Sequence, residues 1–167
     1  MTANTGRTAG KWMKFQIEDS GDVMRDVPIT SINGLGLNYP EVDVSAIQDA
    51  VKGFLTGQPD YSLEISGPMD NSAAQAASGS GAVAALSGSH TVLYDLPGAV
   101  TPLGFGIYCG IQHVWETGEP VFGLEGTADN GLICINYNPN LVDGTYTATF
   151  RLYPGSAAPA WGTAAIS

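Results

Sequence analysis

The sequence predicts a mainly β protein, an antiparallel β-sandwich or barrel with one α-helix. The 22 glycines and 10 prolines among 167 residues favour short strands and turns. Several segments alternate apolar and polar residues, which is the period of a half-buried strand. Helical periodicity is clear in one place, at about residues 45–56. The length suits a single domain, residues 11–153, with an N-terminal arm (1–10) and a C-terminal arm (154–167).

The first predicted strand begins where the polar N-terminal arm ends. Met13, Phe15 and Ile17 alternate with polar residues, so one face of this strand is expected in the core. A turn at 20–22 then leads into a second extended run, residues 23–32. A third extended piece is expected at 37–44, where a proline indicates an edge strand or a bend.

The predicted helix at 45–56 has a start signal, an apolar stripe and a stop signal. Ser45 and Gln48 have the spacing of a capping box, and Gly57 suits a left-handed C-terminal cap. The apolar stripe must cover either the sheet of its own chain or a neighbouring subunit. Its members are Ile47, Val51, Phe54 and Leu55, and the last two are candidate assembly-interface residues.

The second half of the chain reads as a long loop followed by more strands. After a strand at 61–67, residues 71–89 are small and nearly uncharged, which predicts an exposed loop with a functional or partner-ordered role. The C-terminal arm contains Pro159 and Trp161, two further candidate assembly-interface residues. Between the loop and this arm, strands are expected at 90–96, 105–115, 120–127, 132–137 and 145–153, with turn residues at 138–140 and 143–144.

Charge excludes classical nucleic-acid binding. The chain has 16 acidic and 6 basic residues, a net charge of −10, and no Lys or Arg between residues 53 and 150. Affinity for phosphates depends on clustered Lys and Arg. The sequence also lacks the roughly 20 consecutive apolar residues of a membrane span and, at its start, the apolar run of a secretory signal. We therefore expect a protein made in the cytoplasm, without a membrane partner.

The two cysteines, Cys109 and Cys134, form neither a disulfide framework nor a metal motif. Two buried free thiols are the expected state. A bridge between neighbouring strands and a reactive thiol are the alternatives.

Candidate chemical groups are present, but none has the spacing of a site. Adjacency of His90 to serines does not supply the geometry of a nucleophile and its base, and His113 near two glutamates lacks metal-ligand spacing. We therefore expect no enzyme activity, cofactor or metal. The groups considered are Ser87, Ser89 and His90; His113, Glu116 and Glu119; Asp19, Asp22 and Asp26 as Ca²⁺ ligands; and Trp12, Trp115 and Trp161 as sugar-stacking rings, with Trp115 expected in the core.

A family resemblance is carried by the order of several segments. Pro-Glu-Val-Asp-Val-Ser at 40–45 introduces the predicted helix, the strand 61–67 ends in glycine, and a long alternating strand is followed by a small-residue tail with proline and tryptophan. This order resembles the tail tube proteins of long-tailed bacteriophages, which are related in fold to some capsid decoration proteins.

The resemblance implies a virion structural protein that forms homo-hexameric, stacked rings. Each ring would close a β-barrel from the sheets of six copies, and other phage tail or capsid proteins would be its partners. DNA would pass through without specific binding, helped by an acidic wall that repels phosphates. A capsid decoration protein and a carbohydrate-binding module are the alternative functions.

Overall fold

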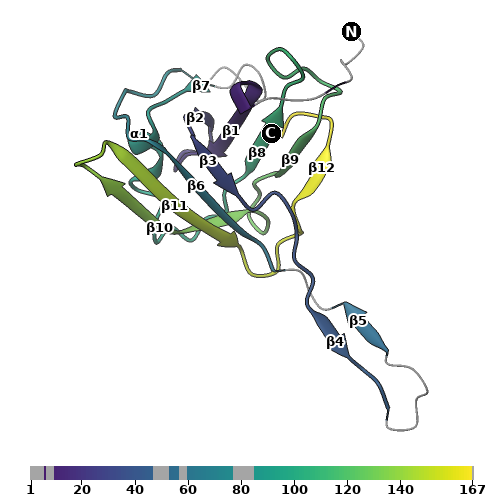
Figure 1. The fold of residues 1–167 in the computed structure, drawn as a ribbon. Helices are drawn as coiled ribbons and strands as arrows, with labels where there is room; N and C mark the ends of the chain where they lie inside the picture. Colours follow the sequence, from purple (N-terminus) through teal and green to yellow (C-terminus); the bar gives the residue numbers. More distant parts are fainter. Residues whose placement is uncertain (1–5, 7–9, 47–52, 57–59, 77–84, 167) are drawn as a thin grey trace.

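The computed structural model describes residue 6 and residues 10–46, 53–56, 60–76 and 85–166. Two β-sheets face each other and form the body, and a two-stranded hairpin extends from it (Figure 1). The larger sheet has six strands in the order β12-β9-β8-β1-β2-β7, and the smaller has four in the order β10-β11-β6-β3. The predicted β-sandwich class is therefore confirmed.

All neighbouring strands run antiparallel except β2 and β7, which pair in parallel. The six-stranded sheet consists of β1 (Met13–Glu18), β2 (Met24–Val27), β7 (Ala85–Leu86), β8 (Phe105–Cys109), β9 (Val121–Leu124) and β12 (Ala160–Gly162). The four-stranded sheet consists of β3 (Ser31–Asn33), β6 (Ser62–Pro68), β10 (Leu132–Asn140) and β11 (Thr145–Leu152). A short 3-10 helix, η1 (Gly10–Trp12), precedes β1.

The hydrophobic core lies between the two sheets, as the alternation of the sequence predicts. Phe15 and Ile17 from β1 meet Leu63 and Ile65 from β6, and all four side chains are fully buried. Such side chains each stabilise the fold by about 1.5–3 kcal/mol through burial. Cys109 and Cys134 are also buried as free thiols, as predicted. Burial raises the pKa of the Cys134 thiol to about 11.

The described end of the segment predicted as a helix is a β-strand. Residues 54–56, expected to be its last turn, form β5 (Phe54–Thr56), which pairs with β4 (Glu41–Asp43). The Ser45 hydroxyl, expected to cap a helix, instead accepts a hydrogen bond from the Gly53 N–H at 2.9 Å across the hairpin. Residues 47–52, and with them most of the expected stripe, lie outside the described part of the chain.

The α-helix of the described chain lies elsewhere, at α1 (Ser89–Leu93), where the sequence predicted the start of a strand. Val92 and Leu93 enter the core from this helix, so these apolar residues form its buried side. The expected turn at 138–140 is also wrong, because β10 continues to Asn140 and the chain reverses at 141–144. None of the helices described is long and apolar enough to span a membrane.

Candidate functional site

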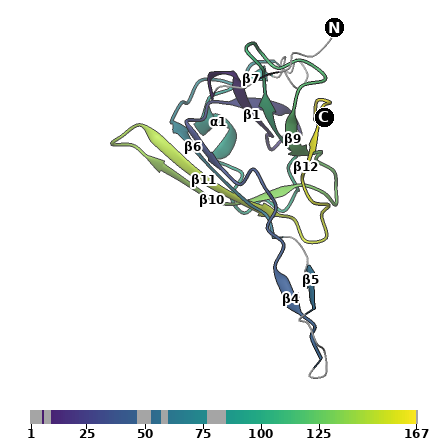
Figure 2. The ribbon, with the colours of Figure 1, turned by 45° about the vertical axis from the view of Figure 1, so that its right-hand side comes forward.

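The hairpin β4–β5 projects away from the body (Figure 2). Several of its apolar side chains are exposed. Val42 lies opposite Leu55 in the register, and their side chains are 50% and 61% exposed. Phe54, opposite Asp43, is 52% exposed. A two-stranded hairpin alone in water is marginally stable, and apolar side chains that are exposed together in one patch can mark an interaction site. The predicted interface residues Phe54 and Leu55 therefore lie together on a projecting arm.

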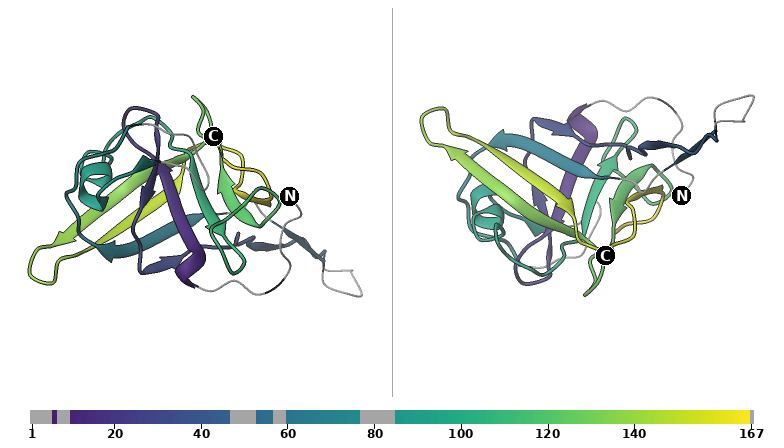
Figure 3. Two further views of the ribbon diagram at one scale, coloured as in Figure 1. Left: turned by 90° about the horizontal axis from the view of Figure 1, so that it is seen from above. Right: turned by 90° about the horizontal axis from the view of Figure 1, so that it is seen from below.

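A second projecting hairpin joins β10 to β11 and leaves the body in a different direction from β4–β5 (Figure 3). Leu141 and Val142 form its turn and are 77% and 94% exposed. The sequence analysis missed this pair, because it ended the preceding strand at Tyr137. Two consecutive apolar residues next to the turn residues Asp143 and Gly144 were the signal that could have revealed it.

The C-terminal segment adds an edge strand to the six-stranded sheet. β12 pairs with β9 and is the outermost strand on that side. Trp161 lies half-exposed against Phe122, while Pro159 is buried. The structure thus separates the two predicted C-terminal interface residues, because of the two only Trp161 is exposed.

The outer face of the four-stranded sheet is polar, small and nearly uncharged. Cross-strand rows place Thr147 beside Ser66 and Ser31, and Thr149 beside Glu64 and Asn33. At the end of β11, Arg151 forms an exposed ion pair with Asp60 at 3.1 Å. Uncharged hydroxyl and amide groups can donate hydrogen bonds, but they lack the positive charge on which strong phosphate binding depends.

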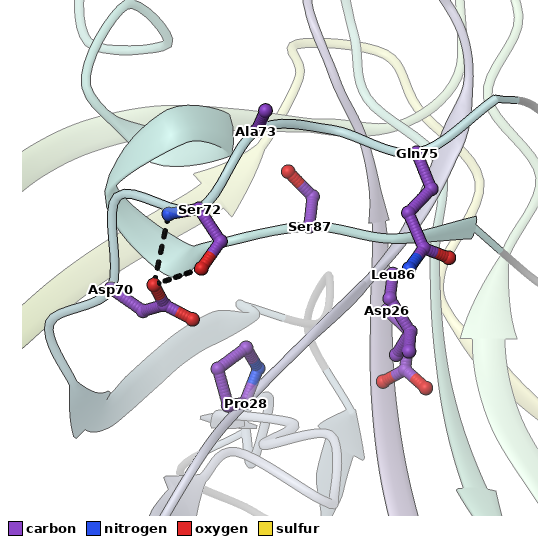
Figure 4. A pocket seen from close by; sticks show the side chains of 8 residues that line it. All are labelled: Asp26, Pro28, Asp70, Ser72, Ala73, Gln75, Leu86 and Ser87. Atoms are coloured by element: carbon purple, nitrogen blue, oxygen red, sulfur yellow. Dashed lines mark hydrogen bonds between the residues drawn. The ribbon is translucent and has the colours of Figure 1, made fainter.

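A cavity of about 340 Å³ lies between β2, β7 and the segment 70–75 (Figure 4). Its two carboxylates already have partners within the chain. Asp26 forms an ion pair with Lys14 at 2.8 Å, and Asp70 accepts hydrogen bonds from the backbone N–H and the hydroxyl of Ser72, which lower its pKa. The Ser87 hydroxyl is buried without a hydrogen-bond partner. No histidine or cysteine is among the lining residues, and the two carboxylates that could act as bases are engaged in the contacts named above.

Two of the candidates from the sequence, Ser89 and His90, form contacts with the four-stranded sheet. The Ser89 hydroxyl donates to the Pro68 carbonyl at 2.7 Å and accepts from the Asp70 N–H at 3.0 Å. The His90 imidazole lies 2.9 Å from the Tyr137 hydroxyl through Nδ1. These contacts tie α1 to the four-stranded sheet.

Of the three acidic residues considered as Ca²⁺ ligands, Asp19 serves the first turn and Asp26 pairs with Lys14. Asp19 accepts hydrogen bonds from the N–H groups of Gly21 and Val23 and pairs with Arg25 at 2.6 Å. Within the described ranges, no three His, Cys, Asp or Glu side chains are grouped as metal ligands. Trp115 is buried, as predicted, so only Trp161 of the three tryptophans is classed as exposed.

Comparison with solved structures finds the same fold over nearly the whole chain. The tube-terminating cap of the anti-feeding prophage is 11% identical, with a TM-score of 0.57, and the match covers 98% of this chain and 96% of that one. The sheath/tube terminator of the extracellular contractile injection system PVC is 10% identical, also with a TM-score of 0.57, and the match covers 96% and 99%. A chain of the six-fold symmetrised anti-feeding prophage baseplate is 9% identical, with a TM-score of 0.52 and 97% of both chains covered.

Neither a protein-family model nor a curated protein sequence matches the chain. At these identities the likeness establishes the fold, which this chain shares with structural components of phage-tail-like particles.

Proposed function

We propose that the protein is a non-enzymatic, ring-forming component of the tube of a phage-tail-like particle. The observation that carries this proposal is the fold match along nearly the full length of both chains with two proteins described as a tube-terminating cap and a sheath/tube terminator. The match covers at least 96% of each chain, so nearly the whole of this chain corresponds to the two neighbours.

The surfaces described above suit a ring. The four-stranded sheet has open edges at β10 and β3 in the described chain, and edges of this kind are an aggregation hazard unless they are paired or covered. Ring closure between copies of the chain would pair them. The outer face of that sheet, with its rows of Thr, Ser and Asn, would then line the channel, and a transported polymer would find few groups to bind.

Two forms of the proposal differ in how many ring faces bind another ring. A tail tube subunit, as the sequence resemblance implies, stacks hexameric rings without limit, because a heterologous contact repeats along the axis. A terminator binds the last ring on one face and stops the stack. The neighbours with the TM-score of 0.57 favour the terminator.

Negative-stain electron microscopy of the purified protein across a concentration series tests the proposal. Single rings with a central channel that do not stack support a terminator, and tubes that lengthen with concentration support a tube subunit. Monomers or trimers that bind empty capsids would overturn both and favour a decoration protein. Monomers that bind neither capsids nor tubes would leave the ring proposal without support, and a shift of Trp161 fluorescence with polysaccharide would then favour carbohydrate binding.

A further inference from the structure

The turn of the β10–β11 hairpin presents an apolar tip, formed by Leu141 and Val142, which are 77% and 94% exposed. The Asn140 side chain orders this turn. Its Oδ1 accepts hydrogen bonds from the N–H groups of Val142 at 3.1 Å and Asp143 at 3.2 Å, and its Nδ2 donates to the Asp143 carboxylate at 2.7 Å. A partner that covers the apolar tip therefore finds its backbone already ordered, which lowers the entropic cost of binding.

A groove of about 460 Å³ lies between the end of β9, the loop that follows it and the C-terminal segment. We call it the C-terminal groove. Leu124, Trp161 and Ile166 supply its large apolar side chains, and of the described residues that line it Glu125 alone is charged. A concave, mostly apolar surface of this kind is suited to apolar side chains of a partner.

The walls of the C-terminal groove are fixed by hydrogen bonds within the chain. The Ile166 N–H donates to the Tyr108 hydroxyl at 2.9 Å, which ties the end of the chain to β8. The Ala157 N–H donates to the Asn130 side-chain oxygen at 2.8 Å, which joins the C-terminal segment to the loop after β9. The groove is therefore formed in the single subunit, before any partner binds.

The apolar tip and the C-terminal groove lie at opposite ends of the molecule. In Figure 1 the turn of the β10–β11 hairpin is at the left and β12 at the right, and Figure 2 shows the same separation. The tip therefore cannot reach the groove of its own chain. A contact between the two surfaces joins two copies head to tail, and such a heterologous contact, repeated about an axis, generates a ring when the rotation closes.

Charge favours a second copy of the chain at these two surfaces. The chain carries a net charge of −10, with no Lys or Arg between residues 53 and 150, so two copies repel each other wherever their carboxylates meet. At the tip, the Asp143 carboxylate is bonded to Asn140, and the groove contains the single charge of Glu125. Copies that associate here bury apolar surface and bring few acidic groups together.

We propose that the apolar tip of one copy inserts into the C-terminal groove of the next. The inference rests on the proposed ring and names the contact that closes it. Two side chains cover less than the roughly 800 Å² per partner of a stable interface, so they act as its anchor. The tip belongs to β10 and the groove to β12, and each is an edge strand of its sheet in the described chain. These open edges supply further contact area.

Cysteine cross-linking of the full chain tests the contact. Val142→Cys and Ala164→Cys, combined in one chain, place a thiol on the tip and one on the lining of the groove, and the native cysteines are buried. A short bismaleimide should join such copies into dimers and larger oligomers. Val100→Cys with Ala164→Cys is the matched control, because Val100 is 82% exposed outside the hairpin, and its yield should be several-fold lower.

The cross-linking outcomes separate this contact from the ring itself. Rings that give no more cross-linking than the control would overturn the tip-and-groove contact and leave the proposed ring standing. Cross-linked copies that do not form rings would support the contact and count against the ring. Monomers without specific cross-links would overturn both.

Two further variants test whether the contact drives assembly. Val142→Asp places a charge on the tip, and Ala164→Trp fills the groove; both positions are exposed, so the melting temperature should stay that of the wild type. Each variant alone should associate at least about tenfold more weakly in sedimentation, whereas Val100→Asp should associate normally. A mixture of the two should form one-to-one pairs, because each pair retains one tip and one groove. The inference is wrong if either variant forms rings like the wild type, or if the mixture restores rings.

Discussion

Phe122 and Trp161 lie opposite each other across the β9–β12 pair, with ring centroids 5.1 Å apart, although Phe122 is buried and Trp161 is 55% exposed. The core of the sandwich therefore continues outward onto an edge strand and ends in an aromatic ring that water reaches. Aromatic rings that are half-buried in this way are typical anchors of protein interfaces.

Trp161→Ala should affect assembly more than folding. Because about half of the ring is already exposed, the loss in free energy of unfolding should be about 1–2 kcal/mol, below the roughly 3–5 kcal/mol of a buried tryptophan. Urea unfolding measures the first effect and negative-stain microscopy the second. Val100→Ala, at a position 82% exposed, is the control and should change neither. Normal rings from the Trp161 variant would show that this ring is not an interface anchor.

Phe54→Ala should cost about 1–2 kcal/mol in urea unfolding, because the side chain is 52% exposed on the β4–β5 hairpin. A core position under a helix would cost about 3–5 kcal/mol. The double variant Phe54→Ser, Leu55→Ser should leave the melting temperature of the body nearly unchanged and prevent the association of subunits, measured by sedimentation. A large loss of stability instead would place this segment in the monomer core.

The strands that the sequence predicted well are those with one clear buried face. In β11, Tyr146, Ala148 and Phe150 are buried and the threonines between them face outward, so the alternation alone gave the strand and its orientation. The same holds for β1 and β6, where the alternating apolar side chains meet in the core.

The predictions that failed concern segments whose signals fit two structures. Ser45 offers a hydroxyl that can cap a helix or bridge a hairpin, and here it bonds to Gly53 across the hairpin. The spacing of Phe54 and Leu55 from Ile47 and Val51 suits a helical stripe, yet Phe54 and Leu55 pair with β4 and are exposed. The spacing of residues along the chain does not reveal which strands will pair. The candidate interface surfaces could not be predicted in detail either, because they lie on projections that only the three-dimensional arrangement defines.

Two buried tyrosines of the core should respond in opposite ways to the loss of a hydroxyl. The Tyr61 hydroxyl is buried without a hydrogen-bond partner, and burial raises its pKa. The Tyr146 hydroxyl donates to the Pro28 carbonyl at 2.9 Å. Tyr61→Phe should therefore be neutral or stabilise the protein by up to about 1 kcal/mol, whereas Tyr146→Phe should destabilise it by about 0.5–1.5 kcal/mol.

Urea unfolding of the two variants under identical conditions measures this difference, and each serves as the control for the other. Both rings stay in place, so cavity effects cancel. A substantial loss of stability in Tyr61→Phe would mean that its hydroxyl binds an internal water molecule, and equal losses in both variants would contradict the assignment of partners.

The protein should be more stable when the carboxyl group of Glu18, at the end of β1, is neutral than when it is charged. The residue is 7% exposed, and Oε2 accepts a hydrogen bond from the Gly104 N–H at 2.5 Å. Burial raises the pKa of the Glu18 carboxyl, the Gly104 hydrogen bond opposes this, and the charges of Asp22 and Asp19 add to the rise. The unfolded chain therefore loses this proton at a lower pH than the folded one.

Because the pKa of Glu18 is higher in the folded chain than in the unfolded one, its contribution to stability decreases as the pH rises. The stability that protonated Glu18 contributes is fully present below the unfolded pKa, and it is lost as the pH rises through the higher folded pKa. Glu18→Gln should therefore raise the melting temperature at neutral pH, and the gain should shrink as the pH falls toward the acidic range. Glu64→Gln, on the exposed face of β6, is the matched control and should show no such trend. Thermal unfolding of both variants across pH measures the effect. If Glu18→Gln is less stable than the wild type at neutral pH, the charged hydrogen bond to Gly104 outweighs the cost of burying the carboxylate.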